Sequence, residues 1–337
     1  MEENKEKVLV TGASGYIALH CISELINNGY KVKGSIRDLS KKDEFLSSLR
    51  INFGYDDFEI CELNLLKDKG WDEAASDCDY ILHIASPCVI KEPLNQNEII
   101  EPAVEGTLRA LKTSQESSVK KLILTSSIGS MAYGHNKKVI NVDDWTNTSS
   151  NVGSYIKSKT IAEKMAWKFF KDISNPSFSM NTINPGMVFG PILNGNIKGT
   201  STNLILNIMN GKFSFLPNIY FNVIDVRDVA KLHVQSIKNN QCNNKRIIAA
   251  SSKSIHFLEI SKIIRDLGYK KATSNLIPNY LIDFLGIFNK NMKISSTMIN
   301  RGSFDVDISE TVRIYNWEPI PFYKTMKDMT KSIEEII

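Results

Sequence analysis

The sequence predicts an α/β fold with a doubly wound parallel sheet and a smaller, partly interleaved C-terminal lobe. Three observations lead to this fold. Short β-rich runs alternate with helix-like segments over the first half of the chain. The first of these runs leads directly into a glycine-containing turn. The length of 337 residues exceeds one domain of about 150 residues, so the chain has room for a second lobe.

The β-rich runs are the expected strands, and the segments between them are the expected helices. The strand runs cover residues 8–10, 31–36, 80–84 and 122–125, and the helical segments include 15–27 and 98–113. After Pro191 the alternation gives way to loops and resumes near 221–224 and 247–250. We therefore expect residues 1–190 to form the sheet domain, with 221–251 returning to it. Residues 191–220 and 252–337 are expected to form the second lobe.

Composition excludes several classes of protein. The net charge is only +4, and 42% apolar with 23% charged residues is ordinary for a globular protein. Basic doublets are scattered, so we expect neither a nucleic-acid partner nor a membrane surface. The five cysteines include no C-x-x-C pair and the five histidines are dispersed, so we expect reduced thiols and no metal. The polar start and the lack of a long apolar stretch predict a cytoplasmic protein.

The turn after the first strand has the spacing of a phosphate-binding loop. Gly12 and Gly15 can turn tightly and let backbone N–H groups approach a pyrophosphate at the start of a helix. Ala18 takes the third small position, where close contact between helix and strand is required. This places a Rossmann-type dinucleotide site at the turn. Its predicted cofactor contacts are Thr11, Gly12, Ser14, Gly15, Tyr16 and Ile17.

The end of the second strand selects the cofactor. An acidic residue at this point binds the ribose 2′-hydroxyl of NAD, whereas an arginine accommodates the 2′-phosphate of NADP. The strand ends in Arg37, so the sequence predicts NADP(H), with help from Lys41 or its neighbour Lys42. The alternative is that Arg37 is a surface residue paired with Asp38 or Asp43.

The spacing Y-x-x-x-K occurs three times, and its context separates the three pairs. Tyr133 and Lys137 flank glycine and asparagine, which indicates a loop. The pair at 323 and 327 lies on a plausible helix with no serine-rich strand end nearby. Tyr155 and Lys159 begin a strong helical pattern, so they share one face of a helix. The strand run 122–125 ends shortly upstream in two serines, at the edge where ligands bind in parallel sheets.

Ser127, Tyr155 and Lys159 together carry a coherent chemistry. A phenol is a poor acid–base group at neutral pH, but an adjacent ammonium group is expected to lower its pKa. Tyr155 can then give a proton to a carbonyl oxygen as hydride arrives. Ser127 can donate a hydrogen bond to the same oxygen, and Lys159 can bind the nicotinamide ribose. Tyr155 and Lys159 are therefore predicted cofactor contacts as well as catalytic residues.

With these motifs the sequence resembles the extended short-chain dehydrogenase/reductases, within them the dihydroflavonol reductase-like group that includes methylglyoxal and aldehyde reductases. The motifs are TGASGYIA, HIASP, SSIGS, YIKSKTIAEKMAW, NPGMVFGP and VRDVA, in this order along nearly the whole chain. The resemblance implies hydride delivery from C4 of NADPH, with Ser127, Tyr155 and Lys159 as the catalytic set. It also implies cofactor contacts at Asn64, Leu65, Ala85, Ser86, Pro185, Gly186 and Val188.

Three departures from the family pattern limit what is carried over. Asn64 stands where the family usually has aspartate at the adenine, but its side-chain carbonyl can still accept a hydrogen bond. Ala132 replaces the flavonoid-binding asparagine of plant dihydroflavonol reductases, which argues against a dihydroflavonol substrate. Residues 153–159 lack the N-W-Y-C-Y-G-K signature of cinnamoyl-CoA reductases, which argues against a CoA thioester.

The sequence therefore predicts an NADPH-dependent carbonyl reductase that converts an aldehyde or ketone to an alcohol, with substrate bound by the second lobe. One alternative is a nucleotide-sugar epimerase or dehydratase of the same fold, which usually retains NAD. The other is a non-catalytic protein that senses NADP(H). A homodimer is common in the wider family, and no residue in the sequence fixes it.

Overall fold

The computed structural model describes residues 5–55, 57–88, 91–193 and 199–336, and the remaining residues of the predicted domains lie outside it. Its centre is a seven-stranded parallel sheet in the order β11-β7-β5-β4-β1-β2-β3. The strands are β1 (Lys7–Thr11), β2 (Lys31–Ile36), β3 (Phe58–Glu62), β4 (Tyr80–His83), β5 (Lys121–Thr125), β7 (Ser179–Pro185) and β11 (Arg246–Ala249). The predicted doubly wound parallel sheet is confirmed.

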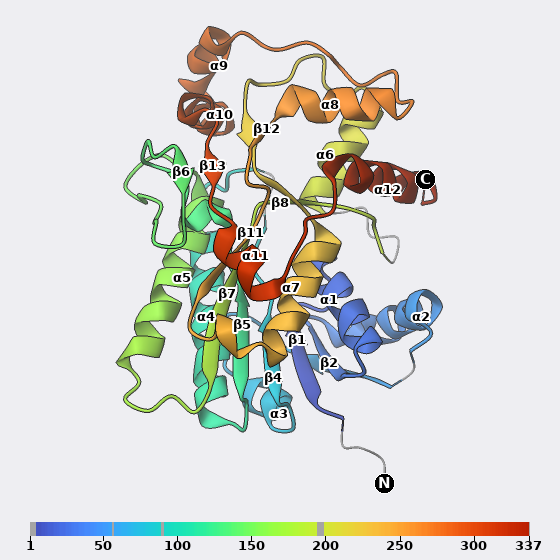
Figure 1. The fold of residues 1–337 in the computed structure, drawn as a ribbon, viewed down its shortest axis with the longest axis vertical. Helices are drawn as coiled ribbons and strands as arrows, with labels where there is room; N and C mark the ends of the chain where they lie inside the picture. The colour runs from blue at the N-terminus through green and yellow to red at the C-terminus, as the bar shows by residue number, and fades with distance from the viewer. Residues whose placement is uncertain (1–4, 56, 89–90, 194–198, 337) are drawn as a thin grey trace.

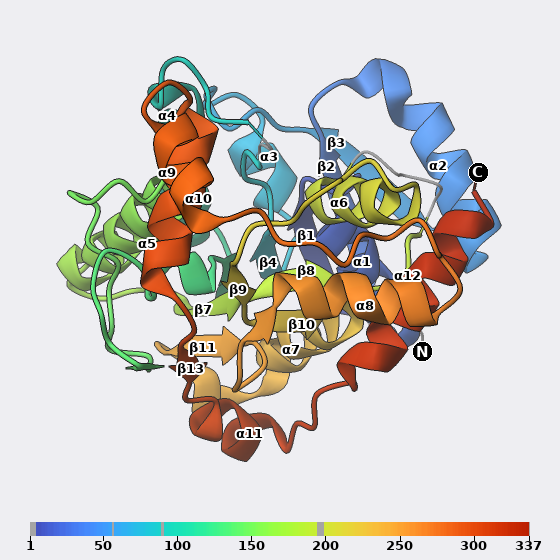
Figure 2. The ribbon, with the colours of Figure 1, turned by 90° about the horizontal axis from the view of Figure 1, so that it is seen from above.

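Helices cover both faces of this sheet, because its strands are apolar on both sides. One face carries α1 (Tyr16–Asn27), α2 (Lys42–Phe53), α7 (Val226–Lys238) and α11 (Ser309–Tyr315). The other carries α3 (Trp71–Ala75), α4 (Asn97–Glu116) and α5 (Ser154–Asp172). Figure 2 shows these layers on opposite sides of the strands. Three short 3₁₀ turns are η1 (Leu39–Lys41), η2 (Ile128–Ser130) and η3 (Asn240–Cys242).

The strand order fixes where a ligand can bind. From β1 the chain runs outward through β2 and β3, and then returns to place β4 on the other side of β1. Loops after neighbouring strands therefore diverge between β1 and β4, which leaves a crevice at their carboxyl ends. The glycine turn follows β1 and the HIASP motif follows β4, so both motifs lie at this crevice.

Further helices lie beyond the carboxyl edge of the sheet. They are α6 (Thr200–Met209), α8 (Phe257–Asp266), α9 (Asn279–Gly286), α10 (Lys290–Arg301) and α12 (Phe322–Glu334). Figure 1 shows them at the end of the molecule opposite to α3. Buried apolar residues of α6, α8 and α12 form a separate core that includes Ile205, Ile260 and Met326.

Short strand pairs link this second layer to the sheet domain. They are β8 (Met187–Phe189) with β10 (Val223–Asp225), β9 (Tyr220–Phe221) with β12 (Ile255–His256), and β6 (Val139–Ile140) with β13 (Asp305–Val306). The chain leaves the sheet after β7, forms part of the upper layer, and returns to pair β11 with β7. The two parts of the fold are therefore interleaved along the chain.

The apolar residues of the upper layer divide into a core and an exposed surface. Leu216 and Ile219 are buried, so the segment 213–221 contributes to the core. On α9 and the turn after it, Tyr280, Phe284 and Phe288 are 69%, 59% and 79% exposed. The segment 277–288 is therefore mostly outside the core. Within the described residues, no helix has both the length and the apolar character needed to cross a membrane.

The central strand β5 allows a test of the core. Leu122 is fully buried in the core that the sheet forms with α3, α4 and α5, so Leu122→Ala should lower the free energy of unfolding by about 3 kcal/mol, through lost burial and an unfilled cavity. Leu94→Ala is the control, because Leu94 is 94% exposed and its loss should change stability by less than about 0.5 kcal/mol. Urea unfolding followed by circular dichroism measures both. Equal effects of the two substitutions would contradict the burial of Leu122.

Candidate active site

The fold brings Ser127, Tyr155 and Lys159 together at the carboxyl end of β5. Ser127 precedes η2, and its Oγ accepts a hydrogen bond from the Gly129 N–H at 3.0 Å. Tyr155 lies in the first turn of α5 and is hydrogen-bonded to Ser127. Lys159 follows one turn later, and its Nζ donates to the Thr125 carbonyl oxygen at 3.0 Å. The i,i+4 spacing on the helix therefore aims both side chains at the same strand end.

The start of α5 is fixed by a residue that sequence reasoning did not single out. Glu92 accepts hydrogen bonds from the Ser154 N–H at 2.8 Å and from its hydroxyl at 2.6 Å. Gly153 precedes the helix with a φ of +85°, a conformation that favours glycine. Glu92 thus accepts a hydrogen bond from an N–H group in the first turn of α5 that has no partner within the helix, although it lies 62 residues away in sequence. The position of Tyr155 depends on this contact, because Tyr155 is the next residue.

Burial dominates the acid–base properties of Tyr155. The environment raises its pKa above the ordinary value, first through desolvation and then through the nearby Cys88 thiol, while the hydrogen bond to Ser127 lowers it. The expectation that Lys159 brings this pKa toward neutrality is therefore not met. Transferring a phenolate from water to a buried site costs more free energy than the attraction of the neighbouring positive charge recovers. Tyr155 is a neutral phenol at physiological pH, and it can act as a proton donor.

Lys159 shows the opposite shift for the same reason. Burial lowers its pKa to about 8, and Cys88 and Glu163 raise it in part. Below this pH the ammonium is present, only 7% exposed, beside the tyrosine. The nearby His83 is buried, and its pKa is lowered to about 3, so this imidazole is neutral. Within this cluster Lys159 is therefore the group that supplies positive charge at neutral pH.

The other two Y-x-x-x-K pairs do not form such a cluster. Tyr133 lies in a loop next to Gly134, whose φ is +75°, and Lys137 pairs with Asp144. Tyr323 and Lys327 lie on α12, where Tyr323 is 54% exposed. Helical spacing alone therefore does not mark the site, and the serine-bearing strand end is the distinguishing feature.

The glycine turn after β1 has the geometry that a pyrophosphate requires. Gly12 has a φ of +67°, and a methyl group added to it would lie 3.0 Å from the Ala85 Cβ. Gly15 precedes α1 and supplies no side-chain cap, and the first turn of α1 holds no acidic residue. The N-terminal N–H groups and the helix dipole thus favour an anion there. Ala18 is fully buried against the sheet.

Several predicted contact residues of this turn also hold the fold together. Thr11 Oγ1 accepts hydrogen bonds from the N–H groups of Ile84 and Ala85, both at 3.0 Å, and so ties β1 to the loop after β4. The Tyr16 hydroxyl donates to the Gly190 carbonyl oxygen at 2.8 Å. Ser14 is exposed, and Ile17 is half-buried against the core beside α1.

Arg37 and Lys41 are exposed beyond the end of β2. Asp38, a partner considered for Arg37, instead accepts hydrogen bonds from the N–H and hydroxyl of Ser40 at 3.0 and 2.7 Å. Within the described part of the chain, no ion pair is found for Arg37. Its guanidinium therefore suits a phosphate better than an internal ion pair.

The remaining predicted contacts follow β3, β4 and β7. Asn64 Oδ1 accepts a hydrogen bond from the Leu66 N–H at 2.9 Å. Leu65 contacts Gly106 of α4, where an added methyl group would lie 2.4 Å from it. Ala85 and Ser86 follow β4, and the buried Ser86 Oγ has no partner among the described residues. This unpaired hydroxyl at the crevice fits a polar ligand.

Pro185 ends β7, and Gly186 and Val188 lead into and through β8. An added methyl group at Gly186 would lie 2.3 Å from the Asn222 carbonyl oxygen, so only glycine fits against this backbone. The chain turns here from the sheet into the upper layer. The predicted residues 185–188 therefore lie beside the carboxyl edge that holds the cluster.

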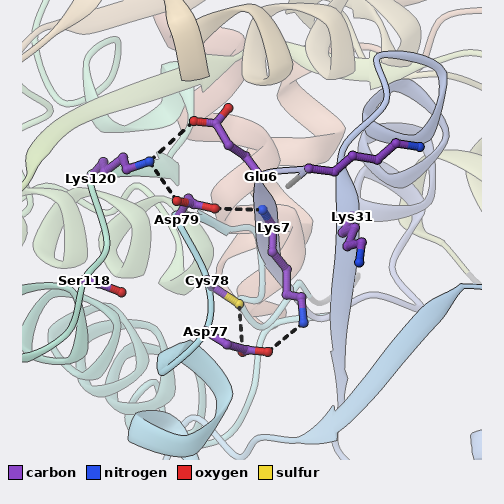
Figure 3. Close-up of a pocket in the computed structure, with 9 residues that line it drawn as sticks. Glu6, Lys7, Lys31, Asp77, Cys78, Asp79, Ser118 and Lys120 are labelled. Carbon is purple, nitrogen blue, oxygen red and sulfur yellow. Dashed lines mark hydrogen bonds and ion pairs between the residues drawn. The ribbon is translucent and has the colours of Figure 1, made fainter. Parts of the chain in front are cut away.

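A hollow of about 510 Å³ lies at the opposite edge of the sheet, at the amino ends of β1, β2, β4 and β5. Figure 3 shows Lys7 between Asp77 and Asp79, and Lys120 between Asp79 and Glu6. These charges pair with one another, so we place the active site at the carboxyl edge instead. Among the described residues, no group of three metal-ligating side chains occurs.

Several known proteins similar to this chain are named as reductases. The sequence profile of the 3-beta hydroxysteroid dehydrogenase/isomerase family matches residues 9–255. The cinnamoyl-CoA reductase CAD2 of Medicago truncatula is 34% identical, over 77% of this chain and 80% of its own length. A Candida albicans protein with the provisional name NADPH-dependent methylglyoxal reductase GRP2 is also 34% identical, over 73% of this chain and 78% of its own length.

The fold also matches solved structures over nearly its whole length. The structure of Gre2 from Candida albicans in complex with NADPH aligns with a TM-score of 0.81 at 26% identity, and covers 98% of this chain and 99% of that one.

Proposed function

Because the chain belongs to the 3-beta hydroxysteroid dehydrogenase/isomerase family of extended short-chain dehydrogenase/reductases, we propose that it is an NADPH-dependent carbonyl reductase acting on an aldehyde or ketone. The hydrogen-bonded Ser127 and Tyr155 beside the buried Lys159 carry this proposal. They place a neutral proton donor, a hydroxyl donor and a positive charge at one point beside the glycine turn. That set matches the needs of a carbonyl oxygen that gains charge.

NADPH supplies the hydride when it is bound. We assign its pyrophosphate to the turn at Gly12 and Gly15, and its 2′-phosphate to Arg37 and Lys41. Asn64 and Leu65 are assigned to the adenine, and Ala85 and Ser86 to the cleft wall. Pro185, Gly186 and Val188 are assigned to the nicotinamide side. The uncapped start of α1 and the unpaired Ser86 hydroxyl support this placement.

The chain's own residues then move the proton. Tyr155 donates its hydroxyl proton to the carbonyl oxygen, while Ser127 donates a hydrogen bond to the same oxygen and holds it in place. Lys159 stabilises the negative charge left on Tyr155, and this interaction is strong because both groups are buried. Burial thus gives Tyr155 its proton at neutral pH and makes Lys159 necessary once that proton leaves.

The two parts of the fold suggest separate binding regions for the cofactor and the substrate. We assign the cofactor to residues 1–190 together with 221–251, supported by the pairing of β11 with β7 in the sheet. We assign the substrate to residues 191–220 and 252–337, supported by the separate core of that layer. A CoA thioester is a second candidate substrate, because one relative is named a cinnamoyl-CoA reductase. Residues 153–159 lack the signature of those enzymes, so an aldehyde or ketone remains the first choice.

Location and assembly extend this proposal. All five cysteines are free thiols, which supports a reducing compartment such as the cytoplasm. We propose a homodimer, which is common in the wider family, and light scattering coupled to size-exclusion chromatography measures its mass.

Loss of the Tyr155 hydroxyl tests the catalytic assignment. Tyr155→Phe should lower kcat by at least about 100-fold, because it removes the proton donor, and should leave NADPH affinity nearly unchanged. Tyr323→Phe is the matched control, since Tyr323 has the same spacing to a lysine but is exposed. Initial rates with small dicarbonyls, aryl aldehydes, aliphatic ketones and one CoA thioester measure kcat for wild type and both variants. Equal rates for Tyr155→Phe and wild type would rule out the assignment.

Cofactor choice is tested at Arg37. Arg37→Ala should weaken NADPH binding by at least about tenfold and NADH binding by much less, because only NADPH carries the 2′-phosphate. Fluorescence titration of both nucleotides measures the two affinities. Arg313→Ala, an exposed arginine of α11 on the outer face, is the control and should change neither. Equal weakening of both nucleotides by Arg37→Ala would count against its contact with the phosphate.

The pKa of Lys159 predicts a pH profile. Lys159 must be protonated to stabilise the tyrosinate, and Tyr155 keeps its proton to higher pH. As pH rises, Lys159 therefore titrates first, near its pKa of about 8. We expect kcat/KM for reduction to fall by about tenfold per pH unit above this point. Circular dichroism at each pH verifies that the protein stays folded. A level profile up to pH 10 would contradict the role of Lys159.

A further inference from the structure

Glu163 is a buried carboxylate that the mechanism above does not use. It lies on α5 four residues after Lys159, on the same helix face, and is 1% exposed. A carboxylate so deeply buried requires compensating partners. It has six polar contacts. Oε2 accepts from Ser126 Oγ (2.5 Å), Ser130 Oγ (2.5 Å) and Asn184 Nδ2 (2.8 Å), and Oε1 from Arg246 Nε (2.7 Å), Thr182 Oγ1 (3.2 Å) and Trp167 Nε1 (3.3 Å).

Three of these contacts reach the backbone that carries Ser127. Ser126 precedes it, and the Ser130 hydroxyl lies 2.8 Å from the Ser127 carbonyl oxygen. The Asn184 amide lies 3.3 Å from the same oxygen, and Asn184 directly precedes Pro185. A single carboxylate on α5 therefore holds the end of β5, the turn η2 and the end of β7. These are the elements that carry Ser127 and the assigned nicotinamide contacts.

Arg246 provides the opposite charge and anchors the cluster on its far side. Its Nη1 donates to the carbonyl oxygens of Val142 and Asp144 at 2.6 and 2.7 Å. Its guanidinium lies 3.8 Å from the centre of the Trp145 ring. Arg246 thus has little freedom to move, and neither does the carboxylate that pairs with it. Such a fully bonded buried network defines a single arrangement of the groups attached to it.

The negative charge of Glu163 also acts on Lys159. The groups around Lys159 are Tyr155 and Glu163 on α5, His83 at the end of β4, Cys88 beyond it, and the Thr125 carbonyl of β5. Burial lowers the pKa of Lys159 to about 8, and the Cys88 side chain and then Glu163 oppose this shift. His83 and Tyr155 are neutral at this pH, so Glu163 is a fixed negative charge that favours the ammonium form.

We propose that Glu163 is the positioning residue of the active site: its carboxylate, paired with Arg246, holds Ser127 against Tyr155 and places a fixed negative charge on the helix face of Lys159. The proposal rests on the proposed reductase function. It predicts two separate consequences of losing the charge. The geometry of proton donation deteriorates, and Lys159 loses its proton at lower pH.

Glu163→Gln tests both consequences, because glutamine keeps the size of the side chain and removes the charge. We expect kcat to fall at least about tenfold while KM for NADPH changes less than about threefold, since a small misplacement affects chemistry more than binding. The alkaline fall in kcat/KM should begin at a lower pH than in wild type. A merely structural role for Glu163 would not move this pH limb.

Two further variants separate the contributions. Glu310→Gln is the matched control, because Glu310 pairs at 2.6 Å with Lys245, the neighbour of Arg246, and is outside the cluster. It should leave kcat and the pH limb unchanged. Ser130→Ala removes one link between the carboxylate and Ser127 but keeps the charge. It should lower kcat without moving the pH limb.

The outcomes are distinguishable. If wild type reduces carbonyls, and a folded Glu163→Gln shows wild-type kcat and the wild-type pH limb, the inference is wrong and the proposed function stands. If Glu163→Gln does not fold, as thermal unfolding would show, Ser130→Ala decides: wild-type kcat overturns the inference, and a reduced kcat at an unchanged pH limb supports it. If wild type reduces no carbonyl with NADPH, the proposed function fails and the inference falls with it.

Discussion

The chemistry that we propose for this protein depends on the carboxyl ends of parallel strands meeting at one edge of the sheet. Strands β1, β4, β5 and β7 are neighbours in space, although they come from distant parts of the sequence. Their ends deliver the glycine turn, Ser86, Ser127 and Pro185 to one crevice. The helix α5 crosses behind β5 and adds Tyr155 and Lys159. A fold with antiparallel neighbours would have sent half of these groups to the opposite edge.

Burial at this edge then sets the properties of the groups it gathers. It keeps the phenol of Tyr155 protonated and makes the ammonium of Lys159 easier to deprotonate. Both shifts oppose charge, and so the site needs fixed polar partners. Ser127 bonds to the phenol, the Thr125 carbonyl to the ammonium, and the Glu163 carboxylate lies behind them. The same desolvation makes any charge that develops on a bound carbonyl oxygen more responsive to these partners.

Much of this arrangement can be predicted from local sequence patterns. Apolar runs in the sequence predict the bounds of β1, β2, β4 and β5 to within a residue or two. Their alternation with helical segments predicts the fold class. Strand β7 was missed because it carries Asn181, Thr182 and Asn184, whose burial depends on partners elsewhere. The roles of Glu92 and Glu163 were missed for the same reason. The rise in the pKa of Tyr155 follows from burial, which the spacing to Lys159 does not reveal.

The central claim is that this crevice transfers a hydride to a carbonyl carbon while Tyr155 protonates the oxygen. The most direct test uses NADPH carrying deuterium on the transferred position of C4, in turn on each face, with an aldehyde or ketone that the protein consumes. Mass spectrometry of the alcohol then reads out the transfer. The account predicts one deuterium on the carbinol carbon from one of the two labelled cofactors. An alcohol without deuterium from either, or no alcohol from any carbonyl despite NADPH binding, would contradict it.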